Sequence, residues 1–486
     1  MQPDPNVIRM SDSPSAPASG GATAPAGGKG AAKPRRKSTI NLGNYIRLME
    51  GYALIYGTKT AWDEEHHRIV PIDALRLAMT SDAVKAWLNS PQRRMVMPEQ
   101  LMFEPGQELP PGCIQLFGGL EVEPLACQAE EVAPMLELLR HLCGDSADTP
   151  EGVREVMHWI LRWQAYPLQR LGAKMQTACV MHGPQGTGKN LYWDVWRDLY
   201  GRYGITVGQT ELEDKFNGWL SQKLAIIGDE VVSRQEMYHN KNRLKLIVTQ
   251  ESKFPIREIQ QPTRWESNHC NVVFLSNESQ PLALEERDRR YMVVYTPLAA
   301  DPALYERVRA YLAADGARKW LYFLKHYPLG DFNPHTKPIL TRAKVDLIQS
   351  GWLPAQRFAH EWMTGFLPLP VRVCSAEQLY RAFQRWCTVY GERFPPPQGR
   401  FTSDVQRWLR EHSNVGSDGP RMVYKVVQLD EPTGRRAVRC WLPSGTGKTD
   451  TYPTEGAWAA ESVRAFEAVL RDYLRDITGS DLEGQG

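Results

Sequence analysis

Eight consecutive residues have the types and the spacing needed to bind nucleotide phosphates. The stretch fits Gly-x-x-x-x-Gly-Lys, in which glycines let backbone N–H groups turn toward phosphate oxygens. Its lysine reaches the outer phosphates, and the helix that should follow adds the partial positive charge of its N-terminus. The alternative interpretation is a glycine-rich turn between a strand and a helix. The expected nucleotide-binding residues are Gly183, Pro184, Gln185, Gly186, Thr187, Gly188, Lys189 and Asn190.

Three oxygen-bearing side chains could complete a magnesium and water site beside this loop. Asn190 stands where Ser or Thr normally holds magnesium, and an amide oxygen can also coordinate this ion. Asp229 and Glu230 follow an apolar run, residues 224–228, that is typical of a buried strand. At the carboxyl end of such a strand, Asp229 can hold magnesium and Glu230 can polarise the attacking water. The alternative is a strand that runs into an acidic turn.

A second polar strand end and a cluster of arginines are candidates for contacts with the γ-phosphate. Asn277 follows the apolar run 271–276 and could order the attacking water or the γ-phosphate. Arg287, Arg289 and Arg290 lie just before another apolar run and could stabilise phosphoryl charge in a neighbouring subunit. The alternative for these arginines is an ordinary solvated face.

The elements that must position these residues alternate between strand and helix patterns. Such alternation predicts an α/β domain with a parallel sheet. Expected strands cover residues 178–181, 205–207, 224–228, 271–276 and 291–295, and expected helices cover residues 153–168, 191–200, 211–220 and 242–250. A hairpin is expected from two extended runs, 254–259 and 265–269, on either side of a polar tip. Its cations Lys253, Arg257 and Arg264 could hold a nucleic-acid backbone, or could be ordinary surface charges.

Composition limits the class of protein. Apolar residues make up 42% of the 486 residues and charged residues 23%, as in soluble globular proteins, while the formal net charge is only +2. Any nucleic-acid binding must therefore come from local patches. Eight scattered cysteines predict packed, reduced thiols in a cytoplasmic protein. The sequence has no apolar run of about 20 residues and no signal-peptide pattern, so we expect no contact with a membrane.

The segments before the loop are less informative. Residues 1–40 are rich in Pro, Ala, Gly and Ser and predict a disordered tail. Residues 41–150 predict an accessory α/β region, in which strands are expected at 52–56 and 113–117 and helices at 71–79 and 81–88.

The C-terminal third predicts a winged-helix domain at residues 355–443. Ser375 should cap one helix, Thr402 or Ser403 should cap a second, and strands at 422–429 and 436–442 should form the wing. Such domains usually bind duplex DNA, although some bind protein. The expected DNA-binding side chains are Arg407 and Arg410 on the second helix and Arg436 on the wing.

The final segment, 444–486, predicts a linker and a helix at 457–477. Residues 444–449 imitate a second phosphate loop, but the first glycine of the pattern is missing and no helix pattern follows directly. We therefore do not expect a nucleotide there.

Taken in order, the phosphate loop, acidic pair, hairpin and Asn277 strand resemble the superfamily 3 helicases, a branch of the AAA+ ATPases. The likeness is to the helicase part of phage and poxvirus-type primase-helicases. It implies an AAA+ motor at residues 151–345 that uses ATP and Mg²⁺, with Asp229 and Glu230 as the Walker B pair. It also implies that Asn277 is the sensor 1 residue and that one of the three arginines is the arginine finger.

The resemblance further implies partners and an activity. It predicts a homo-hexameric ring that translocates on single-stranded DNA, acts on forked DNA, and is encoded by a phage or mobile element. Residues 41–148 show no paired-acid metal site of the primase type, so a separate protein is expected to supply primase activity. Two alternatives are an origin-binding replication initiator with little unwinding activity and a small-molecule phosphotransferase. The second would need neither the arginine cluster nor a DNA-binding domain.

Overall fold

The computed structural model describes residues 40–230, 247–249, 253–257, 264–282, 284, 288–412, 422–444 and 452–475. Four sequence predictions therefore fall wholly or mainly outside the described residues: the tail 1–40, the tip of the hairpin, Arg287, and the stretch 444–449 that imitates a second phosphate loop. Of the helix predicted at 242–250, only residues 247–249 are described, and they are helical. The chain divides into two compact units, with the boundary between Val96 and Met97. The predicted domain boundaries further along the chain stay predictions.

The first unit is a small α/β fold with its own core. Its four strands are arranged in the order β3-β2-β1-β4, with β1 and β4 parallel and the other pairs antiparallel. Leu48, Trp62 and Trp87 are buried in its centre. The strand and the two helices predicted between residues 52 and 88 are confirmed. Its elements are α1 (Leu42–Gly51), β1 (Tyr52–Ile55), β2 (Thr60–Asp63), β3 (Arg68–Pro71), α2 (Ile72–Met79), α3 (Ser81–Asn89) and β4 (Met95–Val96).

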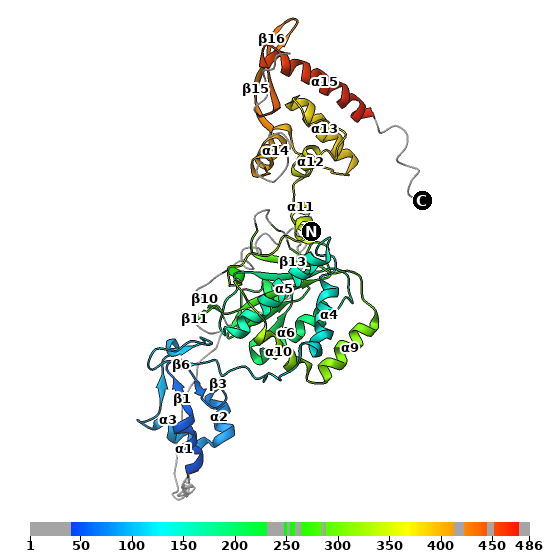
Figure 1. Cartoon of the computed structure of the whole chain (residues 1–486). Helices are drawn as coiled ribbons and strands as arrows, with labels where there is room; N and C mark the ends of the chain where they lie inside the picture. The colour runs from blue at the N-terminus through cyan, green and yellow to red at the C-terminus, as the bar shows by residue number, and fades with distance from the viewer. Residues whose placement is uncertain are drawn as a thin grey trace, which may run out of the picture. The chain divides into compact units, whose positions relative to one another are not determined.

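The second unit contains a five-stranded parallel sheet in the order β13-β7-β12-β9-β8. This α/β arrangement is that of a phosphate-loop domain, and the predicted strands are confirmed. Most strand residues are buried, since helices and the hairpin cover the sheet. Figure 1 shows these strands among α4, α5, α6 and α10. The strands are β7 (Ala178–His182), β8 (Gly204–Val207), β9 (Ala225–Gly228), β12 (Asn271–Ser276) and β13 (Tyr291–Tyr295).

Alternate residues of the central strands face two different layers. Val180, Val272 and Phe274 join one core cluster with α11 and with the hairpin. Met181 lies toward α6, where its sulfur accepts a hydrogen bond from the indole of Trp193. The surrounding elements are β5 (Leu101–Met102), β6 (Ile114–Gln115), α4 (Ala133–Leu142), α5 (Pro150–Gln169), α6 (Lys189–Asp198), α7 (Gln209–Glu213), β10 (Lys253–Ile256), β11 (Arg264–Ser267), α9 (Pro302–Ala313), α10 (Gly316–His326) and α11 (Arg342–Ser350).

Two predictions in this unit are corrected by local hydrogen bonding. The single helix predicted at 211–220 is instead α7 followed by a separate 3₁₀ turn, Gly218–Leu220. Asp214 ends α7 because it takes an extended backbone and accepts a hydrogen bond from the N–H of Phe216. The strand predicted at 113–117 is only the two residues of β6. The side chain of Gln115, the last residue of β6, bonds to both the N–H and the carbonyl of Glu104. These bonds take the place of further backbone pairing between the two strands.

The C-terminal part is a helical layer on a three-stranded antiparallel sheet in the order β14-β16-β15. Ser375 caps α13, as predicted. The predicted cap at Thr402 or Ser403 is wrong, because α14 begins at Gln398 and Ser403 donates its hydroxyl to the Gly399 carbonyl inside the helix. The elements are α12 (Pro354–Met363), β14 (Cys374–Ser375), α13 (Ala376–Val389), α14 (Gln398–His412), β15 (Met422–Glu431), β16 (Gly434–Pro443) and α15 (Glu455–Arg475).

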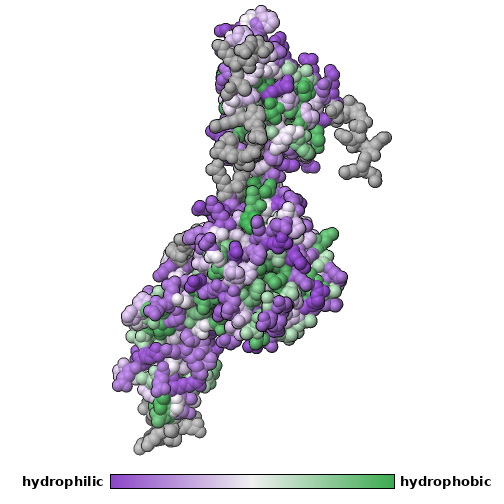
Figure 2. Space-filling view, in the orientation of Figure 1, coloured by the Kyte–Doolittle hydropathy of each residue, from purple (hydrophilic) through white to green (hydrophobic). Residues whose placement is uncertain are grey.

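The helix predicted at 457–477 is present as α15, and it packs onto this part. Phe466 and Leu470 of α15 are fully buried in the same cluster as Trp386 of α13. Among the described residues, no helix is both long and apolar enough to cross a bilayer. Hydrophilic residues cover much of the face seen in Figure 2.

The cysteines provide a test of this fold. All eight are unpaired, and Cys113 and Cys127 are the two that are not fully buried. Burial raises the pKa of Cys270 to about 12 and that of Cys440 to about 11, so little reactive thiolate forms there. We expect a water-soluble maleimide at pH 7.5 to label Cys113 fastest in native protein, then Cys127, whose pKa is also raised by burial, and all eight in denaturant, as measured by peptide mass spectrometry. Rapid native labelling of Cys270 would contradict the packing around the parallel sheet.

Candidate functional site

The glycine loop connects β7 to α6 in a conformation that requires glycine at its ends. Gly183 has φ +135°, and a Cβ there would lie 2.6 Å from the Thr296 hydroxyl. Gly188 has φ +94° and forms the N-cap of α6. The N-terminus of a ten-residue helix therefore opens on the loop, where free backbone N–H groups and the helix dipole favour an anion.

Lys189 is held inside the loop. Its side chain is buried, and its Nζ donates to the carbonyls of Gly183 at 2.9 Å and Pro184 at 2.7 Å. Burial lowers the pKa of Lys189, and the negative charge of Asp229 partly opposes that shift. A phosphate oxygen is charged and is therefore a stronger hydrogen-bond acceptor than a carbonyl oxygen. The Lys189 amine is thus placed to leave these carbonyls and bind a phosphate oxygen.

Asn190 and Asp229, the two predicted metal ligands, are in contact. The Asn190 side-chain nitrogen donates to Asp229 Oδ2 at 2.9 Å, which joins the start of α6 to the end of β9. Asp229 Oδ1 accepts the backbone N–H of Glu230 at 3.1 Å. The pair offers an amide oxygen and a carboxylate to a cation. These donors fit magnesium, which keeps several waters and takes few protein ligands beside nucleotide phosphates.

Glu230 has a strained backbone, with φ +55°. A residue with a Cβ holds this left-handed conformation at a cost of roughly 1–3 kcal/mol, and such strain gathers at functional sites. Its side chain is exposed, next to the Asn190–Asp229 contact. The structure therefore places the predicted water-activating carboxylate at the same edge of the sheet as the loop.

Asn277 lies at this edge too. It follows β12, and β12 pairs in parallel with β7 on one side and β9 on the other. The Gly183 N–H donates to the Ser276 carbonyl at 3.2 Å, so the residue before Asn277 touches the loop. Asn277 is exposed between the strand that leads to the loop and the strand that leads to Asp229.

Sequence reasoning missed His182, the last residue of β7. Its Nδ1 donates to the Glu278 carbonyl at 3.1 Å, and its ring meets Tyr295 edge-on at 5.2 Å. Burial lowers the pKa of His182, which keeps the ring neutral, and the bond to Glu278 ties the loop strand to the turn that carries Asn277. A histidine that ends an apolar run directly before a glycine loop was the available signal.

The two described arginines of the predicted finger cluster lie at the edge of the sheet opposite the glycine loop. Arg289 and Arg290 precede β13, whose first residue pairs with Ala178 at the start of β7. Arg290 forms an ion pair with Asp288 at 3.2 Å, whereas Arg289 is exposed. The loop is a whole strand length away, roughly 13 Å, so these arginines do not meet the phosphate loop of their own chain.

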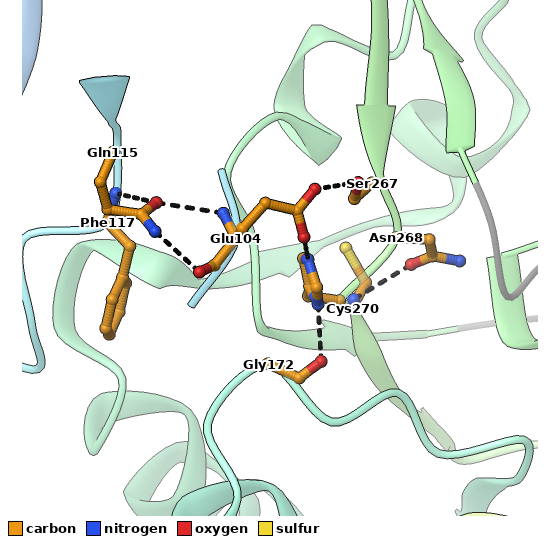
Figure 3. A network of polar contacts seen from close by, with 8 residues as sticks. Glu104, Gln115, Phe117, Gly172, Ser267, Asn268 and Cys270 are labelled. Atoms are coloured by element: carbon orange, nitrogen blue, oxygen red, sulfur yellow. Dashed lines mark hydrogen bonds and ion pairs between the residues drawn. The ribbon is translucent and has the colours of Figure 1, made fainter. Parts of the chain in front are cut away.

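The predicted hairpin is present, and a polar network anchors its root (Figure 3). The Glu104 carboxylate accepts from the Ser267 hydroxyl and lies 3.0 Å from Nε2 of His269. Nδ1 of His269 donates to the Gly172 carbonyl at 2.6 Å. Lys253 and Arg257 are exposed on β10 and just after it, and Arg264 begins β11.

The three DNA-binding candidates of the C-terminal part lie on its surface. Arg407 and Arg410 are exposed on α14, and Arg436 is exposed on β16. Arg407 also pairs with Asp404 at 2.8 Å, and Arg436 pairs with Glu431 at 3.1 Å. In both ion pairs the arginine side chain is exposed to solvent. Ion pairs at exposed positions are weak, so they hold the arginine only loosely.

Known proteins resemble this chain in sequence. Residues 181–290 match the model of a family of unknown function, DUF5906. A DNA primase-polymerase of Nitratiruptor phage NrS-1 is 29% identical over 141 residues, which is 28% of this chain and 19% of that protein. Protein SAV of Sulfolobus acidocaldarius is 33% identical over 87 residues, 18% of this chain and 11% of that protein. The chain thus spans a fifth or less of the length of these curated relatives.

The fold is also similar to a solved structure. The apo structure of the NrS-1 C-terminal region matches with a TM-score of 0.54 and 17% identity, over 82% of this chain and 98% of that one. At this identity the match shows a shared fold. The predicted resemblance to phage primase-type proteins is borne out by the sequence match to the phage primase-polymerase, and the solved structure adds the shared fold.

The contact between Asn190 and Asp229 leads to a prediction about magnesium. Asn190→Leu should raise the magnesium concentration needed for tight nucleotide binding by about tenfold, because one oxygen ligand or its orienting contact is lost. Asn190→Ser, which keeps an oxygen, should stay within about threefold of the parent. The measurement is a magnesium titration of fluorescent ATP-analogue binding. Equal magnesium dependence in all three proteins would remove Asn190 from the site.

Proposed function

We propose that this chain is the ATP-driven motor of a superfamily 3 DNA helicase from a phage or mobile element. The observation that carries this proposal is the gathering of Lys189, Asn190, Asp229, Glu230 and Asn277 at one edge of a parallel sheet. A small-molecule phosphotransferase would also need the loop. It would need neither an anchored hairpin with cations nor exposed arginines at the far edge of the sheet.

Each residue at this edge has a separate task in ATP hydrolysis. Lys189 turns from the Gly183 and Pro184 carbonyls to the outer phosphates of ATP. Asn190 and Asp229 would hold Mg²⁺, which would offset the negative charge of the phosphates. Glu230 orients and polarises the attacking water, and Asn277 aligns that water with the γ-phosphate.

The arginines imply that the site is completed by a second subunit. Because Arg289 lies a strand length from its own loop, it acts on the nucleotide of a neighbour in a ring, which we take to be a homo-hexamer. Of the two described arginines, Arg289 suits this role better, since Arg290 is paired with the buried Asp288. Arginine fingers supplied from a neighbour stabilise the charge of the transferring phosphoryl group.

The C-terminal part is proposed to be a winged helix that binds the duplex portion of forked DNA. Its order is helix, strand, two helices and two long strands, from α12 to β16. The exposed arginines of α14 and Arg436 of the β15–β16 hairpin suit a groove and the adjacent backbone. This surface also favours one alternative, an origin-binding initiator that uses ATP for assembly and unwinds little. A separate primase would serve either protein.

Two substitutions and a strand-displacement assay test the motor. Lys189→Ala and Glu230→Gln should both reduce DNA-stimulated ATP hydrolysis to background, the first by losing phosphate binding and the second by losing water activation. Glu230→Gln should still bind ATP. Lys85→Ala, an exposed lysine of the first unit, is the control. Full turnover by Lys189→Ala would contradict the ATPase assignment, and ATP hydrolysis without unwinding of a fork would favour the initiator.

A subunit-mixing experiment tests the arginine. Arg289→Ala should lower turnover by about 10³-fold or more while ATP binding is retained, because the finger acts on the transition state. Mixing Arg289→Ala with Lys189→Ala subunits should restore part of the turnover, since some interfaces then join an intact loop to an intact arginine. Arg309→Ala, an exposed arginine of α9, is the matched control. Mixtures no more active than their components would exclude catalysis across an interface.

A further inference from the structure

The two faces of the β10–β11 hairpin have opposite surroundings. Phe254 and Ile256 are buried in the core cluster that holds β12 and β9, so one face of the hairpin is fixed to the motor. Trp265, on β11, has 62% of its surface exposed. The other fourteen tryptophans all fall within the described residues and are buried or half-buried. An exposed indole in this chain is therefore exceptional and needs a reason.

The strand register shows what surrounds this indole. Trp265 is directly opposite Pro255, and side chains opposite each other on paired strands share a face. Lys253 and Arg257 lie two positions to either side of Pro255, so they project from the same face, and both are exposed. The outer face thus presents an indole beside a proline ring, with a cation on each side.

This face is held in place from both strands. Asn217 bonds to β10 and the residue after it: its Nδ2 donates to the Pro255 carbonyl at 2.8 Å, and its Oδ1 accepts the Arg257 N–H at 2.7 Å. On β11, the carboxylate of Glu266 accepts from the Ser221 hydroxyl at 2.7 Å and the Gln222 N–H at 3.1 Å. Pro255, the cross-strand partner of Trp265, and Glu266, the next residue of β11, are both held by hydrogen bonds. The indole is therefore presented on a rigid support.

We propose that Trp265 and Pro255 form a stacking platform for a base of single-stranded nucleic acid, with Lys253 and Arg257 contacting the flanking phosphates. The proposal deepens the helicase function and rests on it. Single strands expose the faces of their bases, which stack on aromatic rings whatever the sequence, while a duplex hides those faces. Cations at both sides favour a polyanion over an apolar peptide.

Stacking and charge can be separated by experiment, because they respond differently to salt. Binding of a fluorescent oligo(dT) is measured over a range of salt for the full chain, with Trp265→Ala, Trp265→Phe and the control Leu298→Ala, another exposed apolar residue. Trp265→Ala should weaken binding by between about 5-fold and about 150-fold, the effect of losing one stacked base. Its slope of log K against log salt should equal that of the parent. Trp265→Phe should recover much of the loss. Arg257→Gln should instead reduce the slope by about 0.7.

An abasic oligonucleotide provides the second probe. It has phosphates but no bases, so Trp265→Ala and the parent should bind it equally. ATP hydrolysis without DNA and the number of subunits should not change in Trp265→Ala. Unaltered oligo(dT) binding in Trp265→Ala, with unwinding intact, would overturn the platform but leave the helicase function standing. A changed subunit number would show that Trp265 contacts a second copy of the chain and would overturn the platform too. If the parent itself bound no single strand, the proposed function would fail with it.

Discussion

The parallel pairing of β7, β12 and β9 is the constraint on which the candidate site depends. Parallel strands end at a common edge, so three segments far apart in the chain deliver their next residues to one place. The register pairs Ser276 with His182 and Val207 with Gly228, which leaves Gly183, Asn277 and Asp229 as the first residues beyond the sheet. A shift of one residue in the pairing of β12 would move Asn277 away from the loop. It would also turn each apolar side chain of β12 from its own layer of the core toward the layer on the other face of the sheet.

Charge is organised around the same edge. Lys189 is kept in a buried position by two carbonyls, and its burial is tolerated because Asp229 is near. The positive end of α6 opens on the same space. The edge therefore combines the donors of the loop, the α6 N-terminus and Lys189 with the carboxylates of Asp229 and Glu230. Donors on one side suit an anion, and carboxylates on the other suit a cation bound to that anion.

Much of this arrangement could be predicted from the sequence, for identifiable reasons. A buried parallel strand must be apolar throughout, so β7, β9, β12 and β13 are recognisable as uninterrupted runs. What was missed depends on local backbone geometry that periodicity does not reveal. Asp214 ends α7, where it accepts the Phe216 N–H, and α14 begins at Gln398, ahead of the predicted cap. The position of Arg289 at the edge of the sheet far from the loop follows from the parallel strand direction, which the alternation of strands and helices predicts.

The hairpin is connected to the edge of the sheet that carries the glycine loop by a short segment of chain with fixed contacts. β11 ends at Ser267, and β12 begins at Asn271 and leads directly to Asn277. Asn271 is buried; its Oδ1 accepts the Met175 N–H at 2.8 Å and its Nδ2 donates to the Ala173 carbonyl at 3.0 Å. These bonds tie β12 to the segment that precedes β7. Since a packed core transmits displacement instead of absorbing it, a change at Asn277 has a rigid route to the root of the hairpin. A motor that couples the state of its nucleotide to a grip on a strand needs such a route, and no flexible linker separates the two sites along this stretch of chain.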